Sequence, residues 1–168
     1  MKEYLSPPKF KHMELYNGRI YGSTLDNDVY ASAPRAYSWF NYTDDCIPFS
    51  LQGIKVRGLC AVNTGIYVLS DRGIIYLHGG DIDEFSISQL SSSPVMEDCC
   101  VKTTGNNVLD GKLQQYGTVG LVMTEEGLCL LGNDGLYKVL TDGILDLPSC
   151  SGITMALHNN RIYTLLQR

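Results

Sequence analysis

A hairpin unit that recurs along the chain constrains the fold more than any other feature of the sequence. Each copy has a polar turn, a short apolar and aromatic strand, a bend at Gly, Asp or Asn, and a second such strand. Copies lie at residues 17–32, 64–77 and 126–139, and a fourth begins at 160–164. Repetition of this kind is typical of radial or stacked β architectures, because one unit cannot bury its apolar face alone.

Further apolar runs extend each unit to a group of four strands. Val, Ile, Leu and Tyr gather in runs of about four to eight residues, which is the pattern of strands. The expected strands are His12–Asn17, Arg19–Thr24, Asp28–Ser32 and Ile47–Leu51 in the first group, Ile54–Val62, Gly65–Ser70, Gly73–His78 and Phe85–Leu90 in the second, Cys99–Thr103, Thr118–Thr124, Gly127–Gly132 and Gly135–Thr141 in the third, and Gly152–His158 and Arg161–Gln167 in a half-built fourth group. We therefore predict an all-β, β-propeller-like domain of about three and a half four-stranded blades over residues 12–168, preceded by an N-terminal extension over residues 1–11.

The residues between the expected strands have turn chemistry. Asn17-Gly18 favours a type I′ hairpin turn, in which both central residues need a positive φ. Similar turns are expected at 26–28, 71–73 and 133–135, which are rich in Asp, Asn and Gly. Residues 105–117 are expected to form a surface loop within the third group.

The half-built fourth group predicts a contact. Apolar strands with an open edge pair readily with other chains, so native proteins cover or blunt such edges. We expect the outer edge formed by residues 152–158 and 161–167 to be paired by the N-terminal segment or by another subunit.

Composition excludes several classes of protein. The chain has 168 residues, of which 44% are hydrophobic and 18% charged, and this suits one folded domain rather than a disordered chain. No apolar run reaches the ~18 residues that a membrane-spanning helix needs, and the first residues lack the apolar core of a signal peptide. Synthesis in a cytoplasm is therefore expected, where the six cysteines would be free, mostly buried thiols.

The net charge of −5 disfavours nucleic-acid binding. Proteins that bind phosphate backbones usually present a basic face, and no segment of this chain concentrates Lys or Arg. We therefore expect no sequence-specific contact with nucleic acid. A mildly acidic surface is still compatible with the passive lining of a passage for DNA.

No arrangement of polar residues predicts catalysis, a metal or a cofactor. The acidic run 81–84 lacks the spacing of a calcium-binding loop, so we expect a solvated turn there. Cys99-Cys100 lacks the C-x-x-C spacing of a zinc site, and neighbouring strand residues point to opposite faces, which predicts one core thiol and one partly exposed thiol. The three histidines are far apart in the sequence and are expected to be polar residues at strand ends: His12, His78 and His158. We expect a protein that is not an enzyme and holds no cofactor.

The segment from Tyr37 to Tyr42 has four aromatic residues among six, outside the strand repeat. Trp and Tyr dominate the energetics of protein interfaces, so an exposed loop of this composition is a candidate binding surface. We predict that Tyr37, Trp39, Phe40 and Tyr42 anchor a contact with a partner chain, with Arg35 at the rim. The alternative is that this loop closes over the protein's own core.

The order of these motifs resembles that of β-propeller-like structural proteins of phage and prophage virions, from the tail or neck region. The similar stretches are 18–21, 28–34, 47–49, 65–80, 124–129 and 134–141, and the resemblance extends over residues 7–168, nearly the whole chain. Turn glycines and strand aromatics in a set order carry it, as in Gly18-Arg19-Ile20-Tyr21.

The resemblance implies a non-enzymatic structural protein of the virion, in the tail, nozzle, neck or baseplate, made in the cytoplasm of a bacterial host. The implied partners are other virion proteins and further copies of the chain, with no membrane. The alternative is a carbohydrate- or peptide-binding propeller module, used for host-receptor recognition or glycan hydrolysis.

Overall fold

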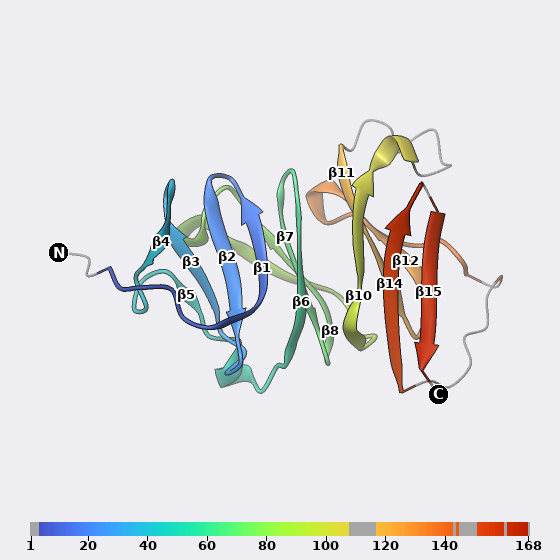
Figure 1. Ribbon diagram of the computed structural model, residues 1–168, viewed down its shortest axis with the longest axis horizontal. Coiled ribbons are helices and arrows are strands. Elements are labelled where there is room, and N and C mark those ends of the chain that lie inside the picture. Colours follow the sequence, from blue (N-terminus) through green and yellow to red (C-terminus); the bar gives the residue numbers. More distant parts are fainter. Residues whose placement is uncertain (1–3, 108–116, 143, 145–150, 160, 168) are drawn as a thin grey trace.

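The computed structural model describes residues 4–107, 117–142, 144, 151–159 and 161–167, and these residues form four antiparallel sheets (Figure 1). The helical elements among them are short 3-10 turns of three or four residues. The predicted all-β class is therefore confirmed. Of the surface loop expected at 105–117, residues 108–116 lie outside the described residues.

The first sheet differs from the predicted group at its outer strand. Its strands are β1 (Phe10–Tyr16), β2 (Arg19–Thr24), β3 (Val29–Ala33), β4 (Ala36–Phe40) and β5 (Cys46–Ile47), and both β4 and β5 pair with β3. The expected strand at 47–51 is mostly the 3-10 helix η1 (Phe49–Gln52). The segment predicted as an aromatic loop is instead the strand β4, because the chain turns back tightly at Arg35, whose φ is 57°.

The other three sheets match the predicted groups closely. The second sheet has β6 (Val56–Val62), β7 (Gly65–Ser70), β8 (Gly73–His78) and β9 (Ser86–Ser91), with η2 (Ile82–Glu84) before β9. The third has β10 (Val95–Thr104), β11 (Thr118–Thr124), β12 (Gly127–Leu131) and β13 (Tyr137–Val139), with η3 (Gly105–Asn107) after β10 and η5 (Asn133–Gly135) before β13. The fourth has β14 (Gly152–His158) and β15 (Arg161–Gln167).

The predicted turns adopt the backbone that their residues favour. Asn17 and Gly18 have φ values of 45° and 76°, as a type I′ hairpin turn between β1 and β2 requires. Asn27, Gly73 and Asp134 also have positive φ at the other predicted bends. These turns set the register of each sheet, since a shift by one residue would move every side chain to the other face.

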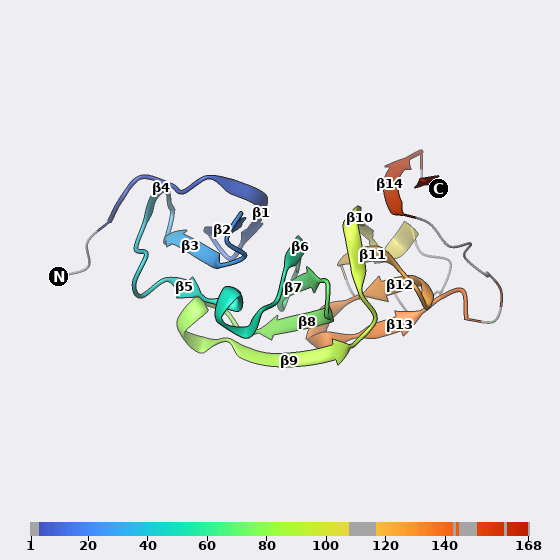
Figure 2. The same cartoon turned by 90° about the horizontal axis from the view of Figure 1, so that it is seen from below.

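Successive sheets are arranged in a row, with their first strands side by side. β1 contacts β6, β6 contacts β10, and β10 contacts β14. Figure 2 shows these first strands toward one side of the molecule, and β9 and β13 toward the other. Neighbouring sheets pack face to face, so the apolar core lies in layers between them.

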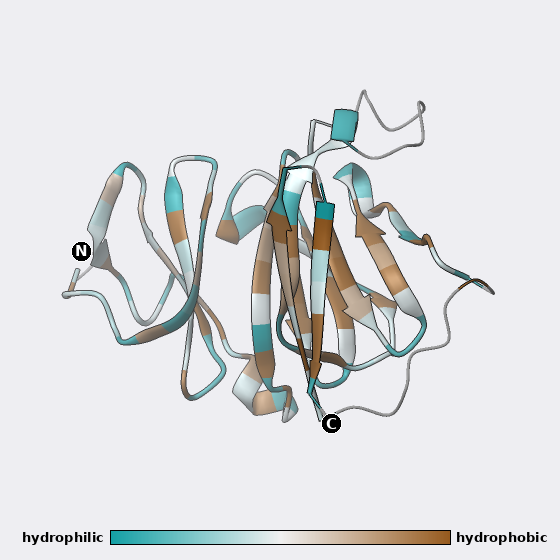
Figure 3. Cartoon of the chain, turned by 45° about the vertical axis from the view of Figure 1, so that its right-hand side comes forward, coloured by the Kyte–Doolittle hydropathy of each residue, from teal (hydrophilic) through white to brown (hydrophobic). Residues whose placement is uncertain are grey.

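Each layer of the core draws on two or more sheets. Tyr21 and Val29 of the first sheet pack with Ile66 and Leu77 of the second. Residues of the second and third sheets pack together with Met155 of β14. Figure 3 shows hydrophobic residues running along the strands of the half that carries the C-terminus.

The N-terminal segment contacts the first sheet. Leu5 and Phe40 exchange backbone hydrogen bonds of 2.8 and 3.0 Å. Within the described part of the chain, β15 pairs only with β14, at the far end from this segment (Figure 1). Pairing of β15 by the N-terminal segment is therefore wrong for residues 4–9, and pairing by another subunit stays a prediction.

No helix among the described residues is long and apolar enough to cross a membrane.

Candidate interaction surfaces

Two exposed apolar surfaces lie at opposite ends of the row of sheets. The aromatic surface is formed by β4, the residues after it and the N-terminal segment, and consists of Tyr4, Leu5, Tyr37, Trp39 and Tyr42. The hairpin surface is the outward face of β14 and β15, and consists of Thr154, Ala156, Tyr163 and Leu165. Both surfaces follow from the alternation of side chains along a strand.

In β4, this alternation separates two neighbouring aromatic residues. Phe40 is 0% exposed and packs on Phe10, with 5.2 Å between ring centroids. Trp39 is 59% exposed on the opposite face of the strand. Phe40 therefore belongs to the core, which corrects its predicted role as an anchor for a partner. Closure over the protein's own core therefore holds for Phe40, and contact with a partner chain stays a prediction for Tyr37, Trp39 and Tyr42.

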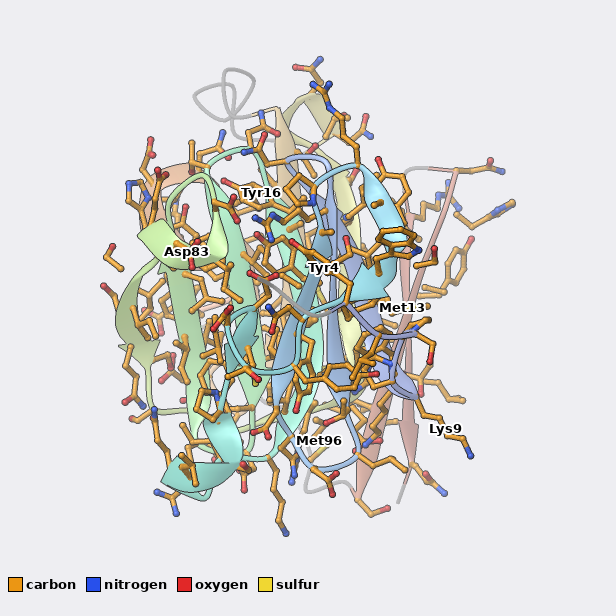
Figure 4. The ribbon with its side chains drawn as sticks, turned by 90° about the vertical axis from the view of Figure 1, so that its left-hand side faces the viewer. Tyr4, Lys9, Met13, Tyr16, Asp83 and Met96 are labelled. Carbon is orange, nitrogen blue, oxygen red and sulfur yellow. The ribbon has the colours of Figure 1, made fainter. Side chains whose placement is uncertain are left out.

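The N-terminal segment completes the aromatic surface. Its backbone bonds to β4 bring Tyr4 beside Trp39, with 6.3 Å between ring centroids. The hydroxyl of Tyr42 donates to the carbonyl of Ser6. The rings of Tyr42 and Tyr30 pack in a T-shaped arrangement, with 5.4 Å between ring centroids. Figure 4 looks onto this end of the molecule, with Tyr4 near the centre of the view.

The remaining predicted residues of this site also lie near β4. Tyr37 is exposed on β4, and Arg35 is exposed in the turn before it. The Arg35 backbone N–H donates to the Gly18 carbonyl at 2.8 Å, which ties this turn to the β1–β2 turn. The sequence reasoning missed Tyr4 and Leu5, and the pairing of Leu5 with Phe40 has no sequence signal.

The hairpin surface has a matching inward face. Ile153 and Met155 are buried against the third sheet, whereas Tyr163 is 53% exposed and Leu165 is 72% exposed. In the hairpin register, Tyr163 lies opposite Ala156 and Leu165 lies opposite Thr154. These four side chains form one continuous face of the two-stranded sheet.

A polar cleft runs along the side of the molecule that carries the first strands. Its volume is about 740 Å³, and Lys11, Lys55, Arg57, Glu97 and Asp98 contribute charges of both signs to its lining. Lys11 pairs with Glu97 across this cleft, and so joins β1 to β10. A cleft of mixed charge of this kind does not favour a ligand of one sign.

The acidic run 81–84 contributes Asp81 to a partly buried ion-pair network rather than forming only a solvated turn. Asp81 accepts a hydrogen bond of 2.6 Å from the Ile82 N–H, which caps η2, and another of 2.9 Å from Arg19. Arg19 also lies 3.6 Å from Asp45, and both side chains are at least nine-tenths buried. Sequence spacing could not reveal this network, because its members come from three distant segments.

The described residues contain no group of three His, Cys, Asp or Glu side chains that could hold a metal ion. The three histidines lie on three different strands: His12 on β1, His78 on β8 and His158 on β14.

The vicinal cysteines divide as predicted, since Cys99 is buried and Cys100 is only half-buried. Burial raises the pKa of the Cys99 thiol to about 11. A hydrogen bond with Cys60, together with burial, raises the pKa of Cys100. These thiols stay protonated near neutral pH, and thiols of this kind are poor nucleophiles.

Stability is expected to fall as the pH rises from about 9 to about 11. The Cys99 thiol has an ordinary pKa of 9.0 when unfolded and about 11 when folded, so the folded state binds more protons in this interval. Its contribution is complete below pH 9 and amounts to about 2–3 kcal/mol, which is lost by about pH 11. Chemical denaturation at a series of pH values measures the slope, and Cys99→Ala should reduce it. An equal slope in the variant would contradict this assignment.

In comparisons with known proteins, no family model matches the sequence, and no curated protein matches it. The two exposed surfaces and the motifs of the sequence are therefore the features of the chain that bear on its function.

Proposed function

We propose that the chain is a structural component of a phage virion, in the tail, neck, nozzle or baseplate, and that it acts through protein–protein interfaces during assembly. The observation that carries this proposal is the pair of exposed apolar surfaces at opposite ends of the row of sheets. Soluble monomers seldom expose contiguous apolar patches, and such patches usually mark interaction sites.

The finer fold proposed with this function is a propeller-like arc of about three and a half blades. Three features support it: antiparallel sheets in chain order, first strands that lie side by side, and core layers between the sheet faces. Radial repetition of small sheets is one of the ways in which β proteins protect their strand edges.

The aromatic surface has the composition of an interface hot spot. Trp39 and Tyr4 are neighbours, and Tyr37 and Tyr42 are exposed beside them. Truncation of aromatic anchors in interfaces typically costs about 2 kcal/mol or more, and large rings lose little conformational entropy on binding. Phe40 holds β4 in place from below, so this surface is displayed on a fixed strand.

Trp39→Ala is expected to lower incorporation into purified virions by more than about tenfold, since about 1.4 kcal/mol corresponds to each tenfold change. Mass spectrometry of the particles measures the incorporation. Ile87→Ala is the matched control, because Ile87 is also exposed but lies on β9, outside both surfaces. Absence of the wild-type chain from virions, or equal incorporation of the two variants, would contradict the proposal.

A carbohydrate-binding module is the second candidate. The exposed rings of Trp39 and Tyr4, tilted by 36° to each other, offer a face on which a sugar ring could stack. Titration of the purified protein with host surface glycans tests this candidate, and loss of binding in Trp39→Ala would support it.

A further inference from the structure

The contacts of the second sheet with the first and with the third follow one pattern. Between the first and second sheets, the first hairpin of one sheet meets the loop after the third strand of the next. Tyr16 donates a hydrogen bond of 2.6 Å to the Gly79 carbonyl, and Asn17 donates one of 2.6 Å to the Gly80 carbonyl. Tyr16 and Asn17 belong to the β1–β2 hairpin, and both glycines follow β8.

The same pattern recurs between the second and third sheets. The Asp134 N–H donates a hydrogen bond of 2.7 Å to the Thr64 hydroxyl, in the β6–β7 turn. The Asn63 N–H donates one of 2.9 Å to the Asn133 side chain, and the Tyr67 hydroxyl donates one of 2.6 Å to the Gly132 carbonyl. Residues 132–134, which make these three contacts, follow β12, the third strand of its sheet. The first and second sheets are thus each covered by the sheet that follows.

The fourth sheet repeats the covered element, and its outward face is exposed among the described residues. Asn17-Gly18-Arg19-Ile20-Tyr21 and Asn159-Asn160-Arg161-Ile162-Tyr163 share four of five residues by position. Asn17 and Asn159 have nearly the same φ, 45° and 47°.

Tyr163 corresponds to Tyr21 and Tyr67, which lie at the same place in the second strands of their sheets. Tyr21 and Tyr67 are both 0% exposed because the next sheet covers them, whereas Tyr163 is 53% exposed. Tyr163 is therefore an exposed copy of a tyrosine that lies buried between sheets in the first and second sheets.

The opposite end of the row offers the complementary surface. Among the described residues, the first sheet lies at one end of the row, and that end carries the aromatic surface. Arg161 is exposed beside the hairpin surface, and the rim of the aromatic surface carries charges of both signs, Arg35 and Asp44. A surface that continues the series of sheets is thus present on the chain itself.

We propose that a second copy of this chain is the partner of the hairpin surface. The Tyr163–Leu165 face of one copy packs on the aromatic surface of the next, and continues the sheet-to-sheet contact that the chain makes twice internally. The two surfaces differ, so the interface is heterologous, and repeated association gives a ring or an open filament. This inference deepens the proposed function and rests on it for its biological role.

Sedimentation velocity of the purified chain tests the proposal. Wild-type protein is expected to sediment as species larger than the monomer, in amounts that rise with concentration. Leu165→Glu and Trp39→Glu each remove one surface and should sediment as monomers, whereas Ile87→Glu on β9 should behave as wild type. Circular dichroism checks that each variant is folded.

Mixing the two monomeric variants gives the decisive result. Trp39→Glu keeps its hairpin surface and Leu165→Glu keeps its aromatic surface, so the mixture should form dimers and nothing larger. A monomeric wild type at high micromolar concentration overturns the proposal. So does self-association of Trp39→Glu alone, which would indicate a symmetric contact between hairpins.

Hydrogen exchange of the wild type keeps the test decisive if a variant does not fold. Backbone amides of residues 36–42 and 161–167 should become protected together as the concentration rises, and protection of only one segment contradicts the proposal. Virion incorporation is measured separately. A chain that associates in solution but is absent from particles contradicts the proposed function alone, and a chain that is incorporated but monomeric in solution contradicts this inference alone.

Discussion

Phe40→Ala is expected to lower the free energy of unfolding by about 3–5 kcal/mol, the usual cost of emptying a buried aromatic site. The ring is 0% exposed, and it packs on Phe10 beneath the strand that displays the aromatic surface. Gly22 lies directly under Phe10, where even a Cβ atom would come within 2.4 Å of the ring. The site has no spare room, so its packing depends on these two rings and this glycine.

The neighbouring variant Trp39→Ala is the matched control, and it is expected to change stability by no more than about 0.5 kcal/mol, as exposed positions usually do. Urea denaturation, with equal m-values for the two variants, measures both free energies. Equal losses in the two variants would mean that the whole segment belongs to the core, and the aromatic surface would then be wrongly assigned.

Arg19→Met is expected to lower the free energy of unfolding by about 3–5 kcal/mol, because it removes the positive charge of a largely buried ion-pair network. The guanidinium of Arg19 donates to Asp81 at 2.9 Å and to the Ser32 carbonyl at 3.1 Å, and it lies 3.6 Å from Asp45. The Asp45 side chain is only 1% exposed, so Arg19 acts on it in surroundings that water hardly reaches.

Arg35→Met is the control for this second prediction, since Arg35 is exposed and belongs to the same sheet. Its expected effect is within about 0.5 kcal/mol. The double variant Arg19→Met, Asp81→Asn separates the two ion pairs, because Asp81 joins the first sheet to the second whereas Asp45 lies within the first. A small loss in Arg19→Met would show that the network contributes little to the packing of these two sheets.

The sequence predicted strands and turns where local chemistry determines them. The Asn17-Gly18 turn and the bend at Gly73 need positive φ, which few other residues tolerate, so their positions could be read directly. With the turns fixed, alternation along each strand placed the strands of the second and third sheets within a few residues.

The site was harder to predict, because it depends on contacts between distant segments. The run from Tyr37 to Tyr42 does not alternate apolar and polar residues, so it lacks the pattern of a half-buried strand. The sequence therefore could not show that Phe40 is buried whereas Trp39 is exposed. The pairing of Leu5 with Phe40 is a backbone contact that carries no residue preference. The hairpin surface did have a signal, since Tyr163 repeats the position of two buried tyrosines.

The order of strands within the sheets also bears on how the chain folds. Nearly every ladder joins strands that are neighbours in the sequence, and the pairing of β5 with β3 spans only one further strand. Local pairing carries a small entropic cost of loop closure and is associated with rapid folding. Each sheet could therefore form soon after its own strands leave the ribosome, in the direction of synthesis. The β14–β15 hairpin is made after the third sheet, and it would close over a sheet that is already folded.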